Sequence, residues 1–129
     1  MNSTHEILYQ EGEIRIELTT DQAAGLVVKF SGVIDHLNPG EFLDPLLLQI
    51  HEAAPRQQAP LVAADLSGLS FLNSSGIKSF VKWIMTQLKL EAAQRYRIEF
   101  HYSPAVTWQQ STLKALVVLS RNTITLQEV

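Results

Sequence analysis

The chain has 129 residues, of which 46% are hydrophobic, and a formal net charge of −3. This is enough for one domain that buries a core without disulfide or metal cross-links. The absence of cysteine excludes a disulfide framework, a thiolate metal site and a thiol nucleophile, and a mildly acidic chain without a basic cluster argues against nucleic-acid binding.

The first half of the chain predicts an opening β-hairpin and a helix. Residues 13–18 alternate polar and apolar side chains, as in a strand with one wet face, and residues 25–30 (GLVVKF) are typical of its partner strand. Two segments, Asn38-Pro39-Gly40-Glu41 and Asp44-Pro45, look like helix starts. Because proline inside a helix removes a hydrogen bond, we expect the main helix to run from Pro45 to Ala54.

Strand and helix patterns alternate in the second half. The apolar run Leu61–Leu66 predicts a central strand covered on both faces, and a loop of small residues leads from it to an amphipathic helix within Ser74–Leu90. The remaining elements are a strand, a helix capped by Ser103-Pro104 and a short last strand: Arg95–Tyr102, Ala105–Ser120 and Thr123–Leu126. This order predicts an α/β fold in which helices pack on a mixed β-sheet, as a single domain over residues 1–129.

The chain shows no sign of export or membrane insertion. Its first residues contain neither a basic segment nor the apolar stretch of a secretory signal. No apolar run is long enough to span a bilayer. We therefore expect a cytoplasmic protein.

Motifs for catalysis are also missing. The glycines are too widely spaced for a phosphate-binding or dinucleotide-binding loop, and the sequence lacks the G-x-S-x-G segment of many hydrolases. The four histidines are scattered, without the spacing of a zinc site: His5, His36, His51 and His101. We expect a protein that is not an enzyme and has no cofactor or metal.

One segment combines small and polar residues at a junction between elements. Residues 65–77 (DLSGLSFLNSSGI) run from the predicted central strand into the amphipathic helix. Asn73 or Ser74 can cap this helix, which contributes about 1 kcal/mol, and Gly76 can simply allow close packing. Alternatively, hydroxyl groups at a helix amino terminus beyond a central strand form a site for a partner or a phosphoryl group.

This segment resembles the signature of the STAS domain, in particular that of bacterial anti-sigma factor antagonists. In that family a strand ending in D-L-S precedes a helix that begins D-S-[ST]-G-[LI]. Residues 30–35 (FSGVID) are similar to the family's strand end L-x-G-x-[LI]-D, and residues 103–106 (SPAV) to its S-P-x-V before the third helix. The resemblance is strongest over residues 25–110 and implies a STAS-like fold.

The resemblance further implies a non-enzymatic regulator of transcription that acts by partner switching. In such antagonists a serine kinase, which is also the anti-sigma factor, phosphorylates the residue that corresponds to Ser74, and a PP2C-type phosphatase reverses the modification. A phosphoserine adds about −1.5 to −2 charge and would repel a partner that fits the neutral hydroxyl. The implied partner-binding residues surround Ser74 or precede the first helix: Asn73, Ser75, Gly76, Lys78, Lys82 and Asp35.

Other interpretations remain open. Asn73 stands where the family usually has aspartate, which favours a constitutive interaction or scaffold module in which Ser74 is only a cap and is not phosphorylated. A further alternative is a module that binds a nucleotide or an anionic lipid head group at the same helix start. Lys78 and Lys82 are more typical of a solvated helix face than of a dedicated binding patch.

Four more residues have a structural and a functional interpretation. Trp83 and Trp108 could anchor a partner, because aromatic residues are enriched at interface hot spots, but we expect both to be partly buried. Asp35 and Asp65 end strand patterns, where capping or turn contacts are more common than recognition.

Overall fold

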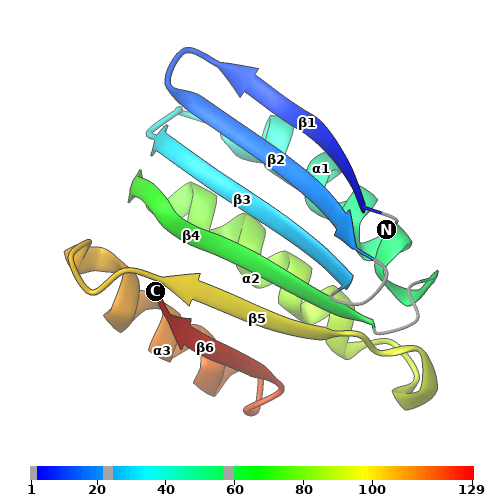
Figure 1. Ribbon diagram of the computed structural model, residues 1–129. Coiled ribbons are helices and arrows are strands. Elements are labelled where there is room, and N and C mark those ends of the chain that lie inside the picture. Colours follow the sequence, from blue (N-terminus) through cyan, green and yellow to red (C-terminus); the bar gives the residue numbers. More distant parts are fainter. Residues whose placement is uncertain (1–2, 22–24, 57–59) are drawn as a thin grey trace.

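The computed structural model describes residues 3–21, 25–56 and 60–129 (Figure 1). In these residues a six-stranded sheet carries three α-helices. The strands are β1 (Ser3–Glu11), β2 (Ile14–Asp21), β3 (Gly25–Ile34), β4 (Leu61–Leu72), β5 (Arg97–Tyr102) and β6 (Ile124–Glu128). The helices are α1 (Gly40–Ala53), α2 (Ser74–Leu88) and α3 (Thr107–Leu119), and two 3₁₀ turns lie at Ala54–Arg56 and Ala92–Gln94.

The strands lie side by side in chain order, from β1 to β6. Antiparallel pairing joins β1, β2 and β3, whereas β3, β4, β5 and β6 are parallel neighbours. Each of the three helices connects two of these parallel strands, as parallel pairing requires. The predicted α/β class with a mixed sheet and an opening hairpin is confirmed.

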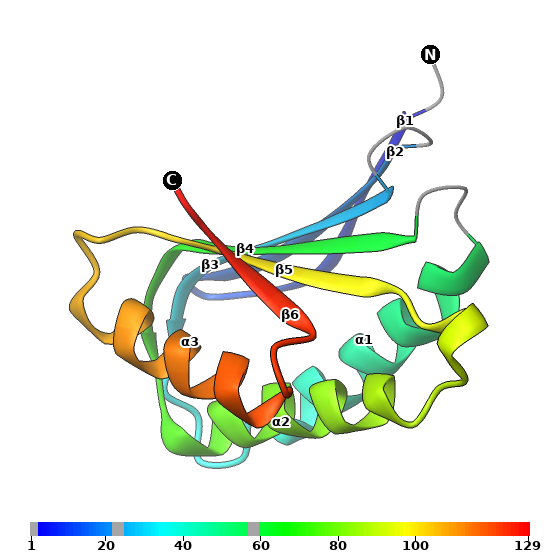
Figure 2. The same ribbon diagram turned by 90° about the horizontal axis from the view of Figure 1, so that it is seen from below.

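All three helices cover the same face of the sheet, as Figure 2 shows. The central place of the strand that contains Leu61–Leu66 is confirmed, but its predicted cover on both faces is wrong. The apolar run was misleading because the face without helices carries only Leu61 and the small Ala63 before Asp65. In the strand register Asp65 lies between Lys29 and His101, and such polar side chains need no covering layer.

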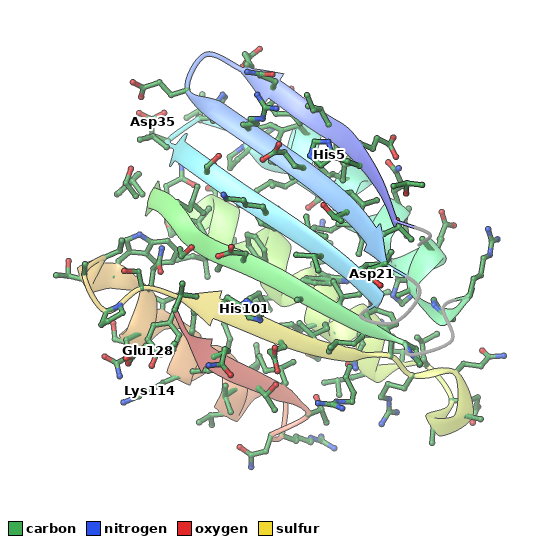
Figure 3. All side chains as sticks on the ribbon, in the orientation of Figure 1. His5, Asp21, Asp35, His101, Lys114 and Glu128 are labelled. Atoms are coloured by element: carbon green, nitrogen blue, oxygen red, sulfur yellow. The ribbon has the colours of Figure 1, made fainter. Side chains whose placement is uncertain are left out.

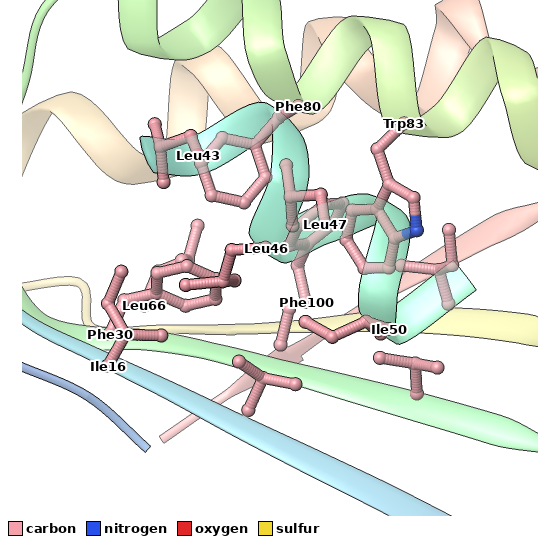
Figure 4. Close-up of a cluster of buried hydrophobic side chains, with 14 of the residues drawn as sticks. Ile16, Phe30, Leu43, Leu46, Leu47, Ile50, Leu66, Phe80, Trp83 and Phe100 are labelled. Atoms are coloured by element: carbon pink, nitrogen blue, oxygen red, sulfur yellow. The ribbon is translucent and has the colours of Figure 1, made fainter. Parts of the chain in front are cut away.

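The core fills the space between this sheet and the helices (Figure 4). Phe80 of α2 packs edge-to-face against Phe30 of β3 and Phe100 of β5, with ring centroids 5.3 and 6.1 Å apart. All three rings are buried. The predicted inward face of the strand near residue 100 is confirmed, since its four apolar members are buried: Tyr96, Ile98, Phe100 and Tyr102.

The structure corrects the predicted start of the first helix. Helix α1 begins at Gly40 and contains Pro45 within it. Continuing the helix through Pro45 allows Leu43 and Leu46 to be buried against the core. The carbonyl that loses its partner is that of Glu41, an exposed residue in the first turn, where water can replace the missing amide.

The segment predicted as a loop before the second helix is part of strand β4, which continues to Leu72. Its pairing with β3 shifts register after Asp65. There the Asp65 Oδ1 atom accepts hydrogen bonds from the Ser67 backbone N–H, at 2.9 Å, and from the Ser67 hydroxyl, at 2.6 Å. Asp65 thus makes the expected turn-like contact, but inside a strand.

The third helix begins at Thr107, two residues later than predicted, and ends at Leu119. The Ser103 hydroxyl accepts from the backbone N–H of Ala105, which precedes the helix, and so does not cap the helix itself. Within the described parts of the chain, none of the helices combines the length and apolar character needed to cross a membrane.

Candidate functional site

The predicted site residues come from two neighbouring parallel strands. Asp35 directly follows β3, and Asn73 connects β4 to α2, which starts at Ser74. Because β3 and β4 are parallel, their carboxyl ends meet at one end of the sheet. Figure 3 places Asp35 at that end. The structure therefore brings together residues that the sequence separates by almost 40 positions.

Asn73 connects the two chain segments with both its backbone and its side chain. Its backbone N–H donates to the carbonyl of Ile34 at 3.0 Å, and its side-chain Nδ2 donates to the carbonyl of His36 at 2.7 Å. Ile34 and His36 flank Asp35, so Asn73 fixes the backbone on both sides of that residue. An ionised aspartate could not make the second bond, because a carboxylate only accepts.

The same side chain caps the following helix. The Asn73 Oδ1 atom accepts from the backbone N–H of Gly76 at 2.8 Å, and the Asn73 carbonyl accepts from Ile77 at 3.0 Å. The predicted capping role of Asn73 is confirmed. The cap thereby engages the Gly76 amide, and the Ile77 amide makes the first hydrogen bond within the helix itself.

Ser74 and Ser75 occupy the first turn of α2. Ser74 is exposed, whereas Ser75 is half-buried. A negative charge on the Ser74 hydroxyl would lie at the positive end of the helix dipole. Gly76 permits close packing behind them, since a Cβ atom at that position would lie 2.4 Å from Leu72 Cδ1.

Two exposed apolar side chains lie within three sequence positions of Asp35 or Ser74. Leu37 is 99% exposed and follows His36, whose carbonyl Asn73 holds, and Phe71, near the end of β4, is 46% exposed. We call Asp35, Leu37, Phe71 and Ser74 together the switch surface. The two apolar members were not predicted. For Leu37 the sequence offers one indication, an apolar residue between the polar residues His36 and Asn38.

The loop that carries Leu37 is braced by contacts with strand β1 and with helix α1. The His36 Nε2 atom lies 3.2 Å from Glu11 Oε1, and its ring packs edge-on against Phe42 at a centroid distance of 5.2 Å. Tyr9 of β1 in turn stacks on the Phe42 ring, with the ring centroids 4.3 Å apart. The position of the switch surface therefore depends on contacts with β1, which lies outside the hairpin predicted from residues 13–18 and 25–30.

The two predicted lysines differ in their surroundings. Lys78 is exposed, whereas the Lys82 ammonium group lies 2.7 Å from Asp44 Oδ2 and links α2 to α1. Burial tends to raise the pKa of Asp44, but its hydrogen bonds with Lys82 and Ser79, together with the positive charge of Lys82, outweigh this and keep the pKa below its ordinary value. A partner that recruits Lys82 would have to replace this ion pair.

The two tryptophans are also placed differently. Trp108 is partly buried, as predicted, and its Nε1 donates to the carbonyl of Ser70 at 3.1 Å. The prediction of partial burial is wrong for Trp83, which is only 3% exposed. Its Nε1 donates to the Tyr96 hydroxyl at 2.8 Å, and this buried partner explains why the indole points inward.

Neither ligand clusters nor comparisons assign a known site. Residues 3–21, 25–56 and 60–129 contain no group of three or more histidine or acidic side chains placed to hold a metal ion. No protein-family model matches the chain, and no curated protein matches it. A function for this chain therefore has to be inferred from the geometry and chemistry of its own residues.

Proposed function

We propose that the protein is a STAS-like regulator that acts by partner switching, with Ser74 as its phosphate acceptor. The exposed position of Ser74 in the first turn of α2, beside the residues that follow β3, is the observation that carries this proposal. A kinase that is also an anti-sigma factor transfers the γ-phosphoryl group of ATP to Ser74 Oγ. ADP and the hydroxyl proton leave, and a PP2C-type phosphatase hydrolyses the ester.

The switch surface supplies a physical reason for the change in affinity. Leu37 and Phe71 offer exposed apolar area to a partner, and the neutral Ser74 hydroxyl can be covered at little cost. Phosphorylation changes the formal charge from −3 to about −5. A partner shaped for the hydroxyl would then bury an unpaired dianion, which is unfavourable.

Phosphate transfer and partner capture test this proposal directly. Tagged wild-type protein, Ser74→Ala and Ser74→Glu are incubated with lysate of the source cells, and captured proteins are identified by mass spectrometry. We expect wild type and Ser74→Ala to capture a serine kinase. Ser74→Glu should capture at least tenfold less of that kinase. With ATP and Mg²⁺, wild type but not Ser74→Ala should gain one phosphate, at residue 74.

Ser111→Glu provides the matched control. It adds the same charge to an exposed serine on α3 and should leave capture unchanged. Phosphate found only on other residues, or equal capture by all four proteins, would contradict the switch.

A constitutive interaction module is the second candidate, and the contacts of Asn73 favour it. The hydrogen bond from Asn73 to His36 holds the switch surface without any contribution from the Ser74 hydroxyl. On this proposal the captured partner is the same before and after phosphatase treatment and for Ser74→Glu. Leu37→Asp, which places a charge on the most exposed apolar side chain, should abolish capture in either case.

A further inference from the structure

A pocket of about 380 Å³ lies between α1 and α2. Its walls include Pro45, Leu47 and Leu48 of α1 and Trp83 and Thr86 of α2. This volume falls in the range of about 300 to 1,000 Å³ that is typical of small-molecule sites, and such sites are mostly apolar with a few directed polar groups.

A chain of three hydrogen-bonding side chains ends at His51, one of the residues that line this pocket. Trp83, whose side chain is seen in Figure 4, donates from Nε1 to the Tyr96 oxygen at 2.8 Å. The Tyr96 oxygen lies 2.7 Å from His51 Nδ1. Because indole can only donate, all three groups are satisfied when the tyrosine hydroxyl donates to His51 Nδ1.

This direction determines the tautomer of His51. Burial lowers the pKa of the imidazole, against a smaller opposing effect of Glu52, so the ring is neutral near pH 7. Burial also raises the pKa of Tyr96, whose hydroxyl therefore keeps its proton. With Nδ1 accepting, the ring proton is on Nε2, and the His51 ring borders the pocket.

The charges at the pocket cancel. Lys82 and Asp44, which also line it, form an ion pair of 2.7 Å, and neutral His51 adds no charge. A carboxylate ligand would approach Asp44 as well as Lys82, and an ammonium ligand would approach Lys82 as well as Asp44. The lining therefore favours an uncharged ligand.

We propose that this pocket binds a small uncharged molecule with an apolar body and a carbonyl oxygen, such as a ketone, lactone or amide. The apolar body contacts Leu47, Leu48 and Trp83, and the carbonyl oxygen accepts a hydrogen bond from His51 Nε2. This site is separate from the switch surface, and its occupancy does not depend on phosphorylation of Ser74.

Three probes of matched shape test the proposal by NMR titration of the ¹⁵N-labelled full chain. 4-Phenyl-2-butanone has the carbonyl, butylbenzene lacks it, and 3-phenylpropionate replaces the methyl ketone with a carboxylate. We expect the ketone to bind most tightly, about fivefold more tightly than butylbenzene, the gain of one neutral hydrogen bond. Shifts should be confined to α1, α2 and the Trp83 indole N–H.

Two variants and one control separate the contribution of the pocket volume to binding from that of the His51 donor. Thr86→Phe fills the pocket from a partly exposed helical position and should abolish binding of every probe, whereas Thr112→Phe, the same change at a partly exposed position of α3, should not. His51→Phe removes the donor and should make the ketone and butylbenzene bind equally.

Each alternative result overturns a defined part of the proposal. Absence of saturable shifts, or binding that survives Thr86→Phe, eliminates the pocket as a site. Equal binding of ketone and butylbenzene by the wild type eliminates carbonyl recognition, and tightest binding of 3-phenylpropionate eliminates the uncharged ligand.

Discussion

The side-chain amide of Asn73 donates a hydrogen bond of 2.7 Å to the backbone carbonyl of His36. Its oxygen at the same time caps α2 through the N–H of Gly76. One side chain thus couples the start of the helix that carries Ser74 to the loop that carries Leu37. The amide is suited to this position because it donates and accepts at once.

Asn73→Asp should therefore destabilise the protein, although it preserves the cap. The carboxylate loses the hydrogen bond to His36 and places its negative charge near a carbonyl oxygen. Together these two effects outweigh the favourable interaction of the carboxylate with the helix dipole. We expect a loss of about 1 kcal/mol in the free energy of unfolding, measured by urea denaturation.

Asn73→Ala is the matched control, because it removes the cap as well. It should cost about 1 kcal/mol more than Asn73→Asp. If Asn73→Asp were as stable as the wild type, the bond to His36 would contribute nothing to stability.

Substitutions of Ser74 should leave stability almost unchanged. The residue is exposed, so Ser74→Ala is expected to stay within about 0.5 kcal/mol of the wild type. Ser74→Glu should be equally or slightly more stable, since a negative charge is favourable in the first turn of a helix, and added salt should reduce the difference. Urea denaturation at low and high salt measures both effects. A loss above about 1 kcal/mol would mean that Ser74 supports the fold.

Gly32 should tolerate substitution far less well than Gly12. Both have positive φ, of 103° and 58° respectively. A Cβ atom on Gly32 would lie 2.0 Å from the backbone oxygen of Glu13, whereas at Gly12 it would meet open space. We expect Gly12→Ala to cost about 1 to 2 kcal/mol and Gly32→Ala about 3 kcal/mol or more. Similar unfolding midpoints for the two variants would contradict this contact.

His51 should make stability depend on pH in the weakly acidic range. Burial lowers its pKa in the folded protein below the ordinary value of 6.5, so the unfolded chain binds the proton more readily. Its stabilising effect is complete above about pH 6.5 and is lost as the pH falls through the lower, folded pKa. Urea midpoints between pH 8 and 5 should therefore fall more steeply for the wild type than for His51→Phe.

The comparison of slopes isolates this histidine. The other three histidines lie near glutamates and are present in both proteins, so their contributions cancel. Parallel pH profiles would show that His51 does not change its proton affinity on folding.

Local patterns in the sequence determined much of this protein. Alternation at residues 13–18 and the helical stripe after Ser74 predicted β2 and α2 because each depends on which side chains of one short segment face inward. The same reasoning placed Asn73 as a cap and Ser74 in the first helical turn, since capping involves only neighbours in the chain.

The tertiary structure decided what depends on distant segments. Packing between elements leaves one face of the sheet open, carries α1 through Pro45 and buries Trp83 against Tyr96. The contacts of Asn73 with His36 and of Tyr96 with His51 join residues 37 and 45 positions apart. Periodicity within a segment carries no information about such pairs, because their hydrogen bonds form only when folding brings separate strands and helices together.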